Sequence, residues 1–541
     1  MTIINSLSSN NAVKFDYIIV GGGTAGCVIA SRLSEYLPDH RVLMIEAGPS
    51  DLNDKRALIL KQRVEMQGTD LEYRYNSVEQ PRGNSHIIHA RAKVLGGCSS
   101  HNDMVSLRTP KYDAVTWERL GCKGWSFETF TRLQDKLRLQ TYPAAHPRDR
   151  NDLSRDWLTS AQKSTGLPFI PSFNDAISSP KGLAAGAGWT PLSYNPDNGH
   201  RASASVAYIH PILRGEEKRP NLTILTNAWV NRVNVQNGVA VSVDVECQGG
   251  SRTVVQAGAE IILCAGAFDT PRLMLLSGLG PRKQLESIKI PVVKDIPGVG
   301  ENLQDHPCST VVFNLHKPVP LTTATHSDVI GLFRHKPENY AGNDGRIPDT
   351  LMHVWALEFC SETSRMGYPV PENPFCMLPI ILRPESKGRV YLISNDPQEP
   401  PAIDFRYFEN TDYDGELLVA GIKTARRIAQ TEPFKSWIKE EVAPGPNIVS
   451  DEDLDQYARS VSHTMYHPAC TAKMGDIEND PLAVVDPQLR VRGVRNLRVA
   501  DASVFPTMVT INLMLTVLAV GERAAELIAE DAGMAGLQSR L

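Results

Sequence analysis

Residues 15–26 read Phe-Asp-Tyr-Ile-Ile-Val-Gly-Gly-Gly-Thr-Ala-Gly, and this stretch decides the fold of the chain. Residues 15–20 are mainly β-branched and aromatic, which predicts a buried strand. The spacing G-x-G-x-x-G follows, and an apolar helical pattern begins at Cys27. Such glycines permit a tight turn and the close approach of a pyrophosphate, which the positive helix N-terminus attracts. The stretch therefore predicts a Rossmann-type dinucleotide site made by Gly21, Gly23, Thr24, Ala25 and Gly26.

A second apolar run, residues 41–45, predicts the next strand and ends at Glu46. An acidic residue about 20 positions after the glycines is placed to accept hydrogen bonds from an adenosine ribose. NAD and FAD enzymes share this arrangement. The N-terminal region therefore predicts a dinucleotide and leaves open which one.

Residues 94–105 read Val-Leu-Gly-Gly-Cys-Ser-Ser-His-Asn-Asp-Met-Val. The two glycines let the backbone pass close to a flat or charged ligand, because no Cβ stands in the way. Small hydrogen-bonding side chains follow, and among them is the imidazole of His101. The same composition is typical of an ordinary surface loop, so the rest of the chain has to decide between the two interpretations.

Further motifs along the chain support the ligand interpretation. They are Arg-Ala-Ser at residues 201–203, residues 266–281 (Gly-Ala-Phe-Asp-Thr-Pro-Arg-Leu-Met-Leu-Leu-Ser-Gly-Leu-Gly-Pro), Asn-Leu-Gln-Asp-His-Pro at 302–307, Met-Tyr-His-Pro at 465–468 and residues 498–503. Together with residues 94–105, these motifs resemble the glucose–methanol–choline (GMC) oxidoreductases. The resemblance is closest to the choline-oxidase-like branch with a histidyl-linked FAD, and it extends from about residue 15 to about residue 528.

This resemblance implies FAD as the cofactor, attached covalently through His101 to the flavin 8α-methyl group. It also implies a set of further contacts with the cofactor. In addition to Glu46 and the glycine turn, these are Gly97, Ser100, Asn102, Asp501, Ala502 and the backbone of Val230, which in the family holds the adenine.

The resemblance places His467 as the catalytic base, with Asn512 beside it. Removing hydride from an alcohol carbon requires a base near the hydroxyl, and a neutral imidazole is well suited to that task near pH 7. The chain has fourteen histidines, and a histidine taken alone is more often structural. Asn512 also has a second interpretation, because it lies just ahead of an apolar helical pattern that its side chain could cap. In the family the flavin accepts the hydride, and O₂ reoxidises it to give hydrogen peroxide.

Four positions bear on the substrate: Arg63, Asp103, Asn314 and His353. Choline oxidases hold a quaternary ammonium group with aromatic rings and a carboxylate. By motif matching, Asn314 stands at the carboxylate's position and Arg63 at that of a cage tryptophan, whereas His353 is retained. These changes predict a small polar primary alcohol or aldehyde hydrate, although Asp103 would favour a cation if it faces the pocket. Choline oxidase or dehydrogenase proper, and a GMC-fold lyase with non-redox FAD, are the alternatives.

The expected fold class is α/β, with a Rossmann-type FAD-binding domain and an α+β substrate-binding domain built on an antiparallel sheet. The FAD-binding domain is predicted to be discontinuous, over residues 1–50, 85–110, 200–310 and 480–541. Residues 111–199 and 311–479 are assigned to the substrate-binding domain. The 541 residues are ample for two packed lobes.

Composition narrows the classes of protein further. The chain is 42% hydrophobic and 22% charged, which is ordinary for a globular protein, and its net charge of −5 offers no basic surface for nucleic acid. The longest apolar run, residues 512–520, is far shorter than the ~18–20 residues that span a bilayer. The nine scattered cysteines lack metal-ligand spacing, so no metal is expected.

The final tripeptide, Ser539-Arg540-Leu541, is a variant of the peroxisomal Ser-Lys-Leu address, which an import receptor reads. We therefore expect a peroxisomal location, with the cytoplasm as the alternative. A homodimer is expected only by analogy with the family.

Overall fold

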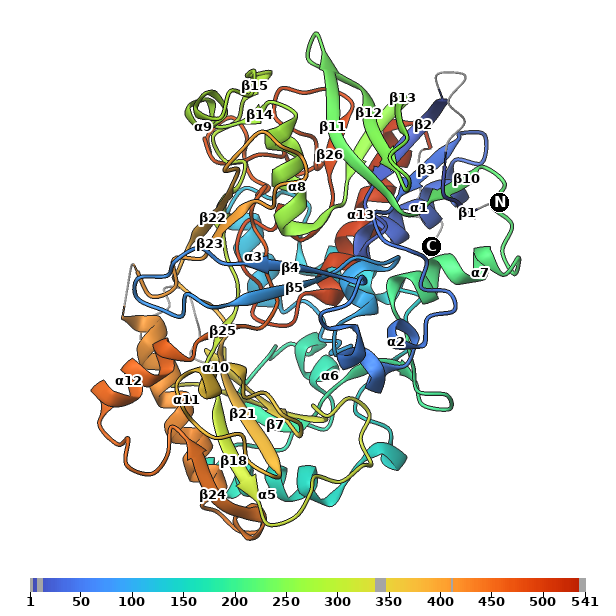
Figure 1. Cartoon of the computed structure of the whole chain (residues 1–541). Coiled ribbons are helices and arrows are strands. Elements are labelled where there is room, and N and C mark those ends of the chain that lie inside the picture. Colours follow the sequence, from blue (N-terminus) through green and yellow to red (C-terminus); the bar gives the residue numbers. More distant parts are fainter. Residues whose placement is uncertain (1–2, 7–12, 336–346, 410–411, 535–541) are drawn as a thin grey trace.

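The structure is a computed structural model that describes residues 3–6, 13–335, 347–409 and 412–534. It confirms the mixed α/β class, with a dinucleotide-binding sheet and a second, antiparallel sheet. The two sheets lie in different parts of the molecule, the first toward the upper right of Figure 1 and the second toward the bottom. The tripeptide Ser539-Arg540-Leu541 lies outside the described residues.

The first sheet is parallel over its N-terminal strands and antiparallel at one edge. Its strands in spatial order are β1 (Ile3–Ile4), β10 (Leu222–Leu225), β3 (Val42–Ile45), β2 (Val13–Val20), β13 (Arg252–Leu263), β12 (Val239–Cys247) and β11 (Ala228–Gln236), with β26 (Leu497–Val499) paired to β13. Strand β2 ends at Val20, where the glycine turn begins and brings the dinucleotide motif to the carboxyl edge of the sheet. This is the edge at which open α/β sheets bind their ligands.

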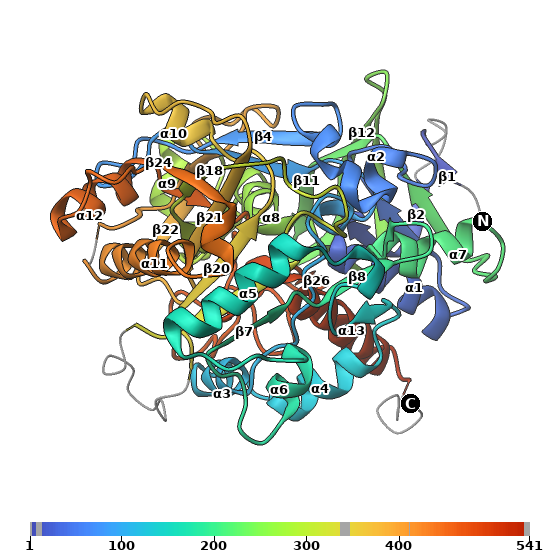
Figure 2. The same ribbon diagram turned by 90° about the horizontal axis from the view of Figure 1, so that it is seen from below.

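The second sheet is antiparallel, and its central strands are buried on both faces. Its strands are β24 (Ile438–Ala443), β18 (Val311–Leu315), β21 (Pro374–Ile381), β20 (Thr350–Trp355), β19 (Val329–Phe333) and β7 (Gly186–Trp189), joined by β17 (Pro307–Cys308) and β25 (His463–Thr464). Two long helices, α5 (Asp152–Thr165) and α11 (Tyr413–Ala429), pack against each other and against this sheet (Figure 2).

Further helices and short sheets complete the described part of the chain. The other helices are α1 (Thr24–Tyr36), α2 (Lys55–Leu58), α3 (Lys111–Arg119), α4 (Phe127–Asp135), α6 (Phe173–Ser178), α7 (His210–Leu213), α8 (Gly266–Leu276), α9 (Arg282–Ser287), α10 (Ser361–Arg365), α12 (Asp451–Ser460) and α13 (Met514–Asp531). The short sheets pair β4 (Glu72–Asn76) with β5 (Ile88–Ala92), β14 (Leu279–Gly280) with β15 (Lys294–Asp295), β16 (Glu301–Leu303) with β22 (Gly388–Tyr391) and β23 (Ala402–Asp404), and β6 (Thr141–Tyr142) with β8 (Leu192–Asn195) and β9 (His200–Arg201).

Helix α13 lies directly against α1, the helix that starts at the glycine turn. A Cβ at Gly521 would lie 3.0 Å from the Cβ of Val28, so the small residue allows this close approach. The C-terminal helix therefore braces the dinucleotide motif and fixes where its own N-terminal end lies. That end carries Asn512, two residues before the helix begins.

Three further features position these elements. The charged segment 50–93 contains α2, a 3₁₀ turn and the β4–β5 hairpin. Strand β22 pairs with β16 and β23 and not with the second sheet. Helix α4, which lies in the range predicted for the substrate-binding domain, packs on α13, where Arg132 Nη1 lies 2.6 Å from Glu526 Oε1.

Over the described residues, the helices include none long and apolar enough to cross a membrane. The same part of the chain holds no group of three or more His, Cys, Asp or Glu side chains placed to bind a metal ion.

Candidate active site

A cavity of about 300 Å³ is lined by residues from both halves of the molecule. One end lies at the carboxyl edge of the first sheet, and the other is closed by β20 and the segment after β25. Most of the candidate site residues predicted from the sequence line this cavity: Gly21, Gly23, Thr24, Ala25, Glu46, Arg63, Gly97, His101, Asn102, Asp103, Val230, His353, His467, Asp501, Ala502 and Asn512.

The glycine turn and the loop at residues 94–105 meet at one wall of this cavity. A Cβ at Gly97, whose φ is +54°, would lie 2.7 Å from the Cα of Gly23. At Gly21, whose φ is +105°, a Cβ would lie 2.4 Å from the carbonyl oxygen of Cys264. Both positions therefore require glycine, and the two segments form one continuous backbone surface.

Gly26 differs from the prediction, because it does not belong to the described residues that line the cavity. A Cβ there would lie 1.9 Å from the carbonyl oxygen of Gly21. Gly26 therefore allows α1 to pack onto the turn, which is the usual task of the third glycine in this motif.

Glu46 holds the turn in place from the next strand. Its carboxylate accepts hydrogen bonds from the backbone N–H groups of Gly22 at 2.9 Å and Gly48 at 2.8 Å. Burial raises the pKa of this carboxyl to about 7, although the same hydrogen bonds oppose the rise. The side chain lies at the cavity wall, as does Val230 of β11, so both occupy the end predicted to hold an adenosine.

Asp501 fixes the start of helix α8 at the opposite wall. One carboxylate oxygen accepts from the N–H of Gly266 at 2.8 Å and from the hydroxyl of Thr270 at 2.6 Å. The other accepts from the N–H of Ser503 at 2.8 Å. A Cβ at Gly266 would meet no other described atom within 4 Å, so this edge of the cavity is open to a ligand.

The loop after Gly97 is anchored by a buried arginine. The Nη1 of Arg201 donates to the carbonyl oxygens of Ser99 at 3.2 Å and Asn102 at 2.8 Å. Ser100, which was predicted to contact the cofactor, is instead fully buried behind the cavity wall. Its hydroxyl donates to the carbonyl of Leu95 at 2.9 Å and so shapes the loop from within.

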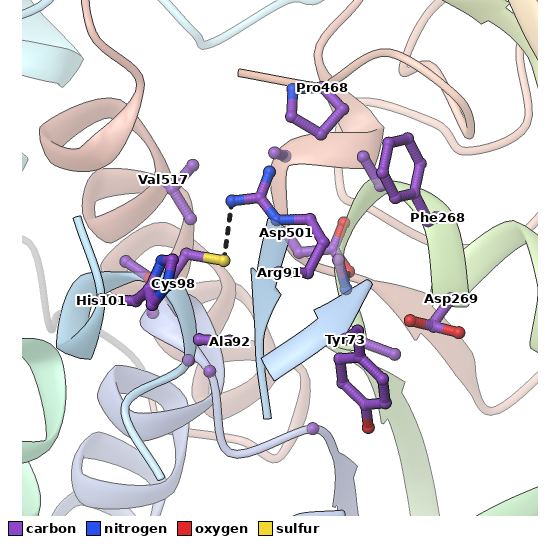
Figure 3. Close-up of a pocket in the computed structure, with 18 of the residues that line it drawn as sticks. Tyr73, Arg91, Ala92, Cys98, His101, Phe268, Asp269, Pro468, Asp501 and Val517 are labelled. Carbon is purple, nitrogen blue, oxygen red and sulfur yellow. Dashed lines mark hydrogen bonds between the residues drawn. The ribbon is translucent and has the colours of Figure 1, made fainter. Parts of the chain in front are cut away.

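His101 projects from this loop into the cavity (Figure 3). Its Nε2 lies 3.4 Å from the Oε1 of Glu72. Burial lowers the pKa of the imidazole, although the neighbouring carboxylate opposes that change. Figure 3 also shows the guanidinium of Arg91 reaching the thiol of Cys98, and its Nη2 donates to Sγ at 2.8 Å.

The protonation of His467 follows from its neighbour His306. The Nε2 of His306 donates to the carbonyl of Val509 at 3.0 Å, so in the neutral ring Nδ1 carries the lone pair. That Nδ1 lies 2.9 Å from the Nδ1 of His467, which must therefore be the donor. The proton of His467 sits on Nδ1, and its Nε2 is left as an acceptor.

Asn512 provides independent support for this assignment. Its Nδ2 lies 3.4 Å from the Nε2 of His467, where an amide N–H meets the lone pair. The residue at the N-terminal boundary of α13 is Leu513, and the start of that helix is not capped by a side chain. The asparagine therefore faces the cavity and is not a helix cap.

The charge state of His467 is set by its surroundings. Burial lowers the pKa of the imidazole well below its ordinary value, His306 lowers it further, and only Asp305 among the main influences raises it. The ring is therefore neutral at pH 7, as a base requires.

Asp305 holds the histidine segment in position. Its Oδ1 accepts from the backbone N–H of His467 at 2.9 Å, and its Oδ2 accepts from the hydroxyl of Tyr407 at 2.7 Å and from that of Thr464. Burial alone would raise the pKa of this carboxyl, but contacts with His89 and the hydroxyls hold the pKa well below its usual value. Asp305 therefore remains an anion that fixes the backbone of the catalytic segment.

His353 presents a hydrogen-bond donor at the substrate end. Its Nδ1 accepts from the indole N–H of Trp355 at 3.2 Å, and burial lowers the pKa of the ring to about 4. The neutral ring therefore carries its proton on Nε2. That atom is buried and has no hydrogen-bond partner among the described residues.

Arg63 and Asp103 both line the cavity and form an ion pair. Asn314 requires a correction, because it does not belong to the described part of the cavity wall. Strand pairing places it beside β24, where its Nδ2 donates to Glu440 Oε1 at 3.0 Å. Its predicted contact with substrate is therefore not supported by the structure.

Several residues at the site were not singled out from the sequence. They are His306 and Asp305 behind His467, Trp355 and Tyr466 in the cavity wall, and Glu72 beside His101. The run Asp305-His306-Pro307 was noted only as a family marker. An acid and an imidazole next to each other in such a marker were a usable signal for a second histidine.

The shape and the lining residues of the cavity fit a flavin dinucleotide. The Gly21, Gly23 and Gly97 backbones form a cradle that side chains would fill, and Glu46 and Val230 lie at the far end of the same cavity. At the other end, two neutral imidazoles and an amide converge. One elongated ligand can therefore contact both the glycine turn and the histidine group.

Comparisons with known proteins agree with this geometry. Two family models described as GMC oxidoreductase match residues 15–308 and 384–521. The chain is 37% identical to a choline oxidase from Arthrobacter globiformis, over 97% of this chain and 96% of that protein. It is 32% identical to an oxygen-dependent choline dehydrogenase from Photobacterium profundum, over 95% and 93% of the two chains. A crystal structure of pyridoxine 4-oxidase from Mesorbium loti superposes with a TM-score of 0.83 at 28% identity, covering 95% and 98%.

Proposed function

The chain belongs to the GMC oxidoreductases, FAD enzymes that act on CH–OH donors, and from that premise we propose that it is an alcohol oxidase. Its substrate is a small polar primary alcohol or the hydrate of an aldehyde, and its electron acceptor is O₂, which is reduced to hydrogen peroxide. Similarity to an oxidase over nearly the full length supports the acceptor.

The observation that carries this proposal is the unprotonated Nε2 of His467, 3.4 Å from the Nδ2 of Asn512. A hydroxyl that approaches from the cavity within hydrogen-bond reach of both atoms donates its proton to Nε2 and accepts a hydrogen bond from the amide. As negative charge develops on the oxygen, the amide N–H stabilises it, and the proton moves to the imidazole. The ring then becomes an imidazolium whose Nδ1–H remains bonded to His306.

Bound FAD supplies the acceptor for the hydride that leaves the carbinol carbon and then passes the electrons to O₂. The glycine turn, Glu46, Val230, Gly97, Asn102, Asp501 and Ala502 would hold it, because all of them line the cavity.

We further propose that a ring nitrogen of His101 forms the covalent link to the flavin. The new N–C bond would replace one C–H bond of the 8α-methyl group, and the two electrons and two protons released would pass to O₂ to give peroxide. The support is local: the imidazole lines the cavity, and burial lowers its pKa so that the ring is neutral at pH 7. The carboxylate of Glu72, 3.4 Å from Nε2, favours the ring proton on that nitrogen and leaves the lone pair on Nδ1. A neutral ring nitrogen is the form that acts as a nucleophile. Acid-precipitated protein should therefore stay yellow, whereas His101→Ala should release its colour into the supernatant.

Anaerobic mixing with a panel of small alcohols tests the main proposal. We expect the yellow flavin absorbance to bleach and to return with one equivalent of peroxide when air is admitted. A dehydrogenase would bleach but return only with a quinone or dye, and a lyase would not bleach with any substrate. If choline bleaches the flavin far better than every uncharged alcohol, choline oxidase proper is the correct assignment.

A further inference from the structure

Arg63 brings a positive charge into the substrate end of the cavity. It comes from the 3₁₀ turn Leu60–Met66, and its side chain is only 8% exposed. The guanidinium forms an ion pair with Asp103, which follows the His101 loop and also lines the cavity. The two residues are 40 positions apart in the sequence, so the contact ties the 3₁₀ turn to the loop that carries His101.

The same guanidinium also lies over an aromatic ring. Its Cζ is 5.8 Å from the centroid of the Trp355 ring, and Trp355 is part of the cavity wall. Its Nη2 donates to the carbonyl of Thr325 at 3.4 Å, which fixes the arginine from the side. The cation is therefore held by a carboxylate, an aromatic face and a backbone carbonyl.

These partners are the ones that a cationic substrate would use. A quaternary ammonium group has no N–H donors, so it binds through aromatic faces and a nearby carboxylate. In this cavity, both Asp103 and Trp355 already hold a cation that belongs to the protein. A second cation would therefore find both partners occupied, and the paired wall offers it no net attraction.

We propose that Arg63 is a specificity-determining residue that occupies the cation subsite and restricts the enzyme to alcohols with uncharged tails. This inference rests on the proposed function and names the substrate class of the same site. The ion pair neutralises Arg63, so this wall offers no net charge to an anionic tail either. An uncharged polar tail meets the Nε2–H of His353, which is buried and has no partner among the described residues.

A purely structural role for the ion pair makes a different prediction. If Arg63 only ties the 3₁₀ turn to the His101 loop, its replacement should lower stability and slow all substrates alike. If it fills a cation subsite, replacement should change the ratio between a cationic and a neutral substrate of the same shape. The ratio therefore separates the two roles.

The test compares choline with 3,3-dimethylbutan-1-ol, which has the same shape and carries carbon in place of the charged nitrogen. Binding is measured from the change in flavin absorbance on titration, and reduction from anaerobic bleaching. The variants are Arg63→Ala and Arg63→Met, which remove the charge and differ in volume. Arg63→Lys, which keeps the charge, is the matched control.

Wild-type protein should favour the neutral alcohol, and either uncharged variant should shift the binding ratio toward choline by about tenfold or more. Arg63→Lys should stay within about threefold of wild type, because it retains the charge. Adding Asp103→Asn to Arg63→Ala should cancel most of the gain, because the freed carboxylate then no longer attracts the ammonium group.

The proposal is overturned if wild-type protein binds choline as tightly as the neutral alcohol, or if neither uncharged variant changes the ratio. The wild-type comparison needs no variant, so a misfolded mutant cannot obscure it. If no alcohol bleaches the flavin, the proposed oxidase function fails, but the binding ratio still tests the role of Arg63.

Discussion

The two ends of the cavity are built in different ways. At the dinucleotide end, the backbone forms the surface: Gly23 and Gly97 touch, and Glu46 binds the N–H of Gly22. At the substrate end, side chains from distant segments form it, with Arg63, His353 and Asn512 all in the wall. The backbone surface would bind the cofactor, whereas the side chains would determine which alcohol binds. Changes at the first end should therefore affect cofactor retention, and changes at the second should affect chemistry and selectivity.

The largest effect that would sharpen this comparison is expected from His467→Ala. The variant should retain stoichiometric flavin, because His467 lies at the substrate end, and anaerobic reduction should slow by about 10²–10⁴-fold. His316→Ala, which removes an exposed histidine outside the cavity wall, is the matched control. Loss of flavin from His467→Ala, with unchanged reduction of whatever flavin remained, would break the division between the two ends.

The next effect concerns the dinucleotide end. Gly97→Ala in a His101→Ala background, where no covalent link can form, should weaken FAD binding by about 10-fold to 100-fold. The reason is the added Cβ, 2.7 Å from Gly23 Cα, at a φ of +54°. Fluorescence titration with FAD measures the affinity.

Gly166→Ala provides the matched control for this experiment. Gly166 also has a positive φ, +70°, but a Cβ there would meet no described atom within 4 Å. It ends α5, far from the glycine turn in sequence and outside the described cavity wall. If both alanines weakened FAD equally, backbone contact at Gly97 would not be what holds the cofactor.

What the sequence alone could predict differs between the two ends of the cavity. The glycine turn, the strand ending at Glu46 and the loop at His101 are local patterns, and the structure places all three at one wall. The error at Asn314 arose because a motif fixes a position along a strand but not the strands beside it. Pairing with β24 turned that side chain toward Glu440.

Other features of the molecule depend on contacts between segments that are distant in the sequence. Strand β4 alternates charged and aromatic residues over Glu72–Tyr75, and it pairs with β5, whose sequence has no such alternation. The role of His306 depends on a neighbour 161 residues away, because only the folded chain brings its Nδ1 to that of His467. Long-range contacts of this kind could not be read from spacing.

A few-fold effect is expected from pH at the substrate end. His467 acts as a base only when unprotonated, so the rate of flavin reduction should fall as pH drops through its pKa. Because burial and His306 lower that pKa, the rate should stay level down to the ordinary histidine value of about 6.5 and fall only below it. The profile is measured by stopped-flow reduction of the flavin over about 1.5 pH units on either side of the ordinary histidine pKa.

Replacement of His306 by Ala should move this acid limb upward, because one of the influences that lowers the pKa of His467 is removed. An acid limb that lies above the ordinary histidine range in wild-type protein, or that does not respond to His306→Ala, would assign the base to another group.

The smallest effect is expected from Asn314→Ala. The side chain bonds Glu440 and is not part of the described cavity wall, so KM should change by less than about twofold while stability falls by about 1 kcal/mol. Steady-state kinetics and thermal unfolding measure the two quantities. His353→Ala should change KM more strongly. If Asn314→Ala changed KM equally, Asn314 of β18 would also contact the substrate.

The proposed chemistry depends on an unprotonated Nε2 of His467 that faces the substrate end of the cavity. Nitrogen-15 NMR of histidine-labelled protein at neutral pH, with His467→Gln to assign the signals, reports directly which ring nitrogen carries the proton. We expect a protonated Nδ1 and an unprotonated Nε2, as the contacts with His306 and Asn512 require. A proton on Nε2, or a fully protonated imidazolium at neutral pH, would contradict the assignment of His467 as the base.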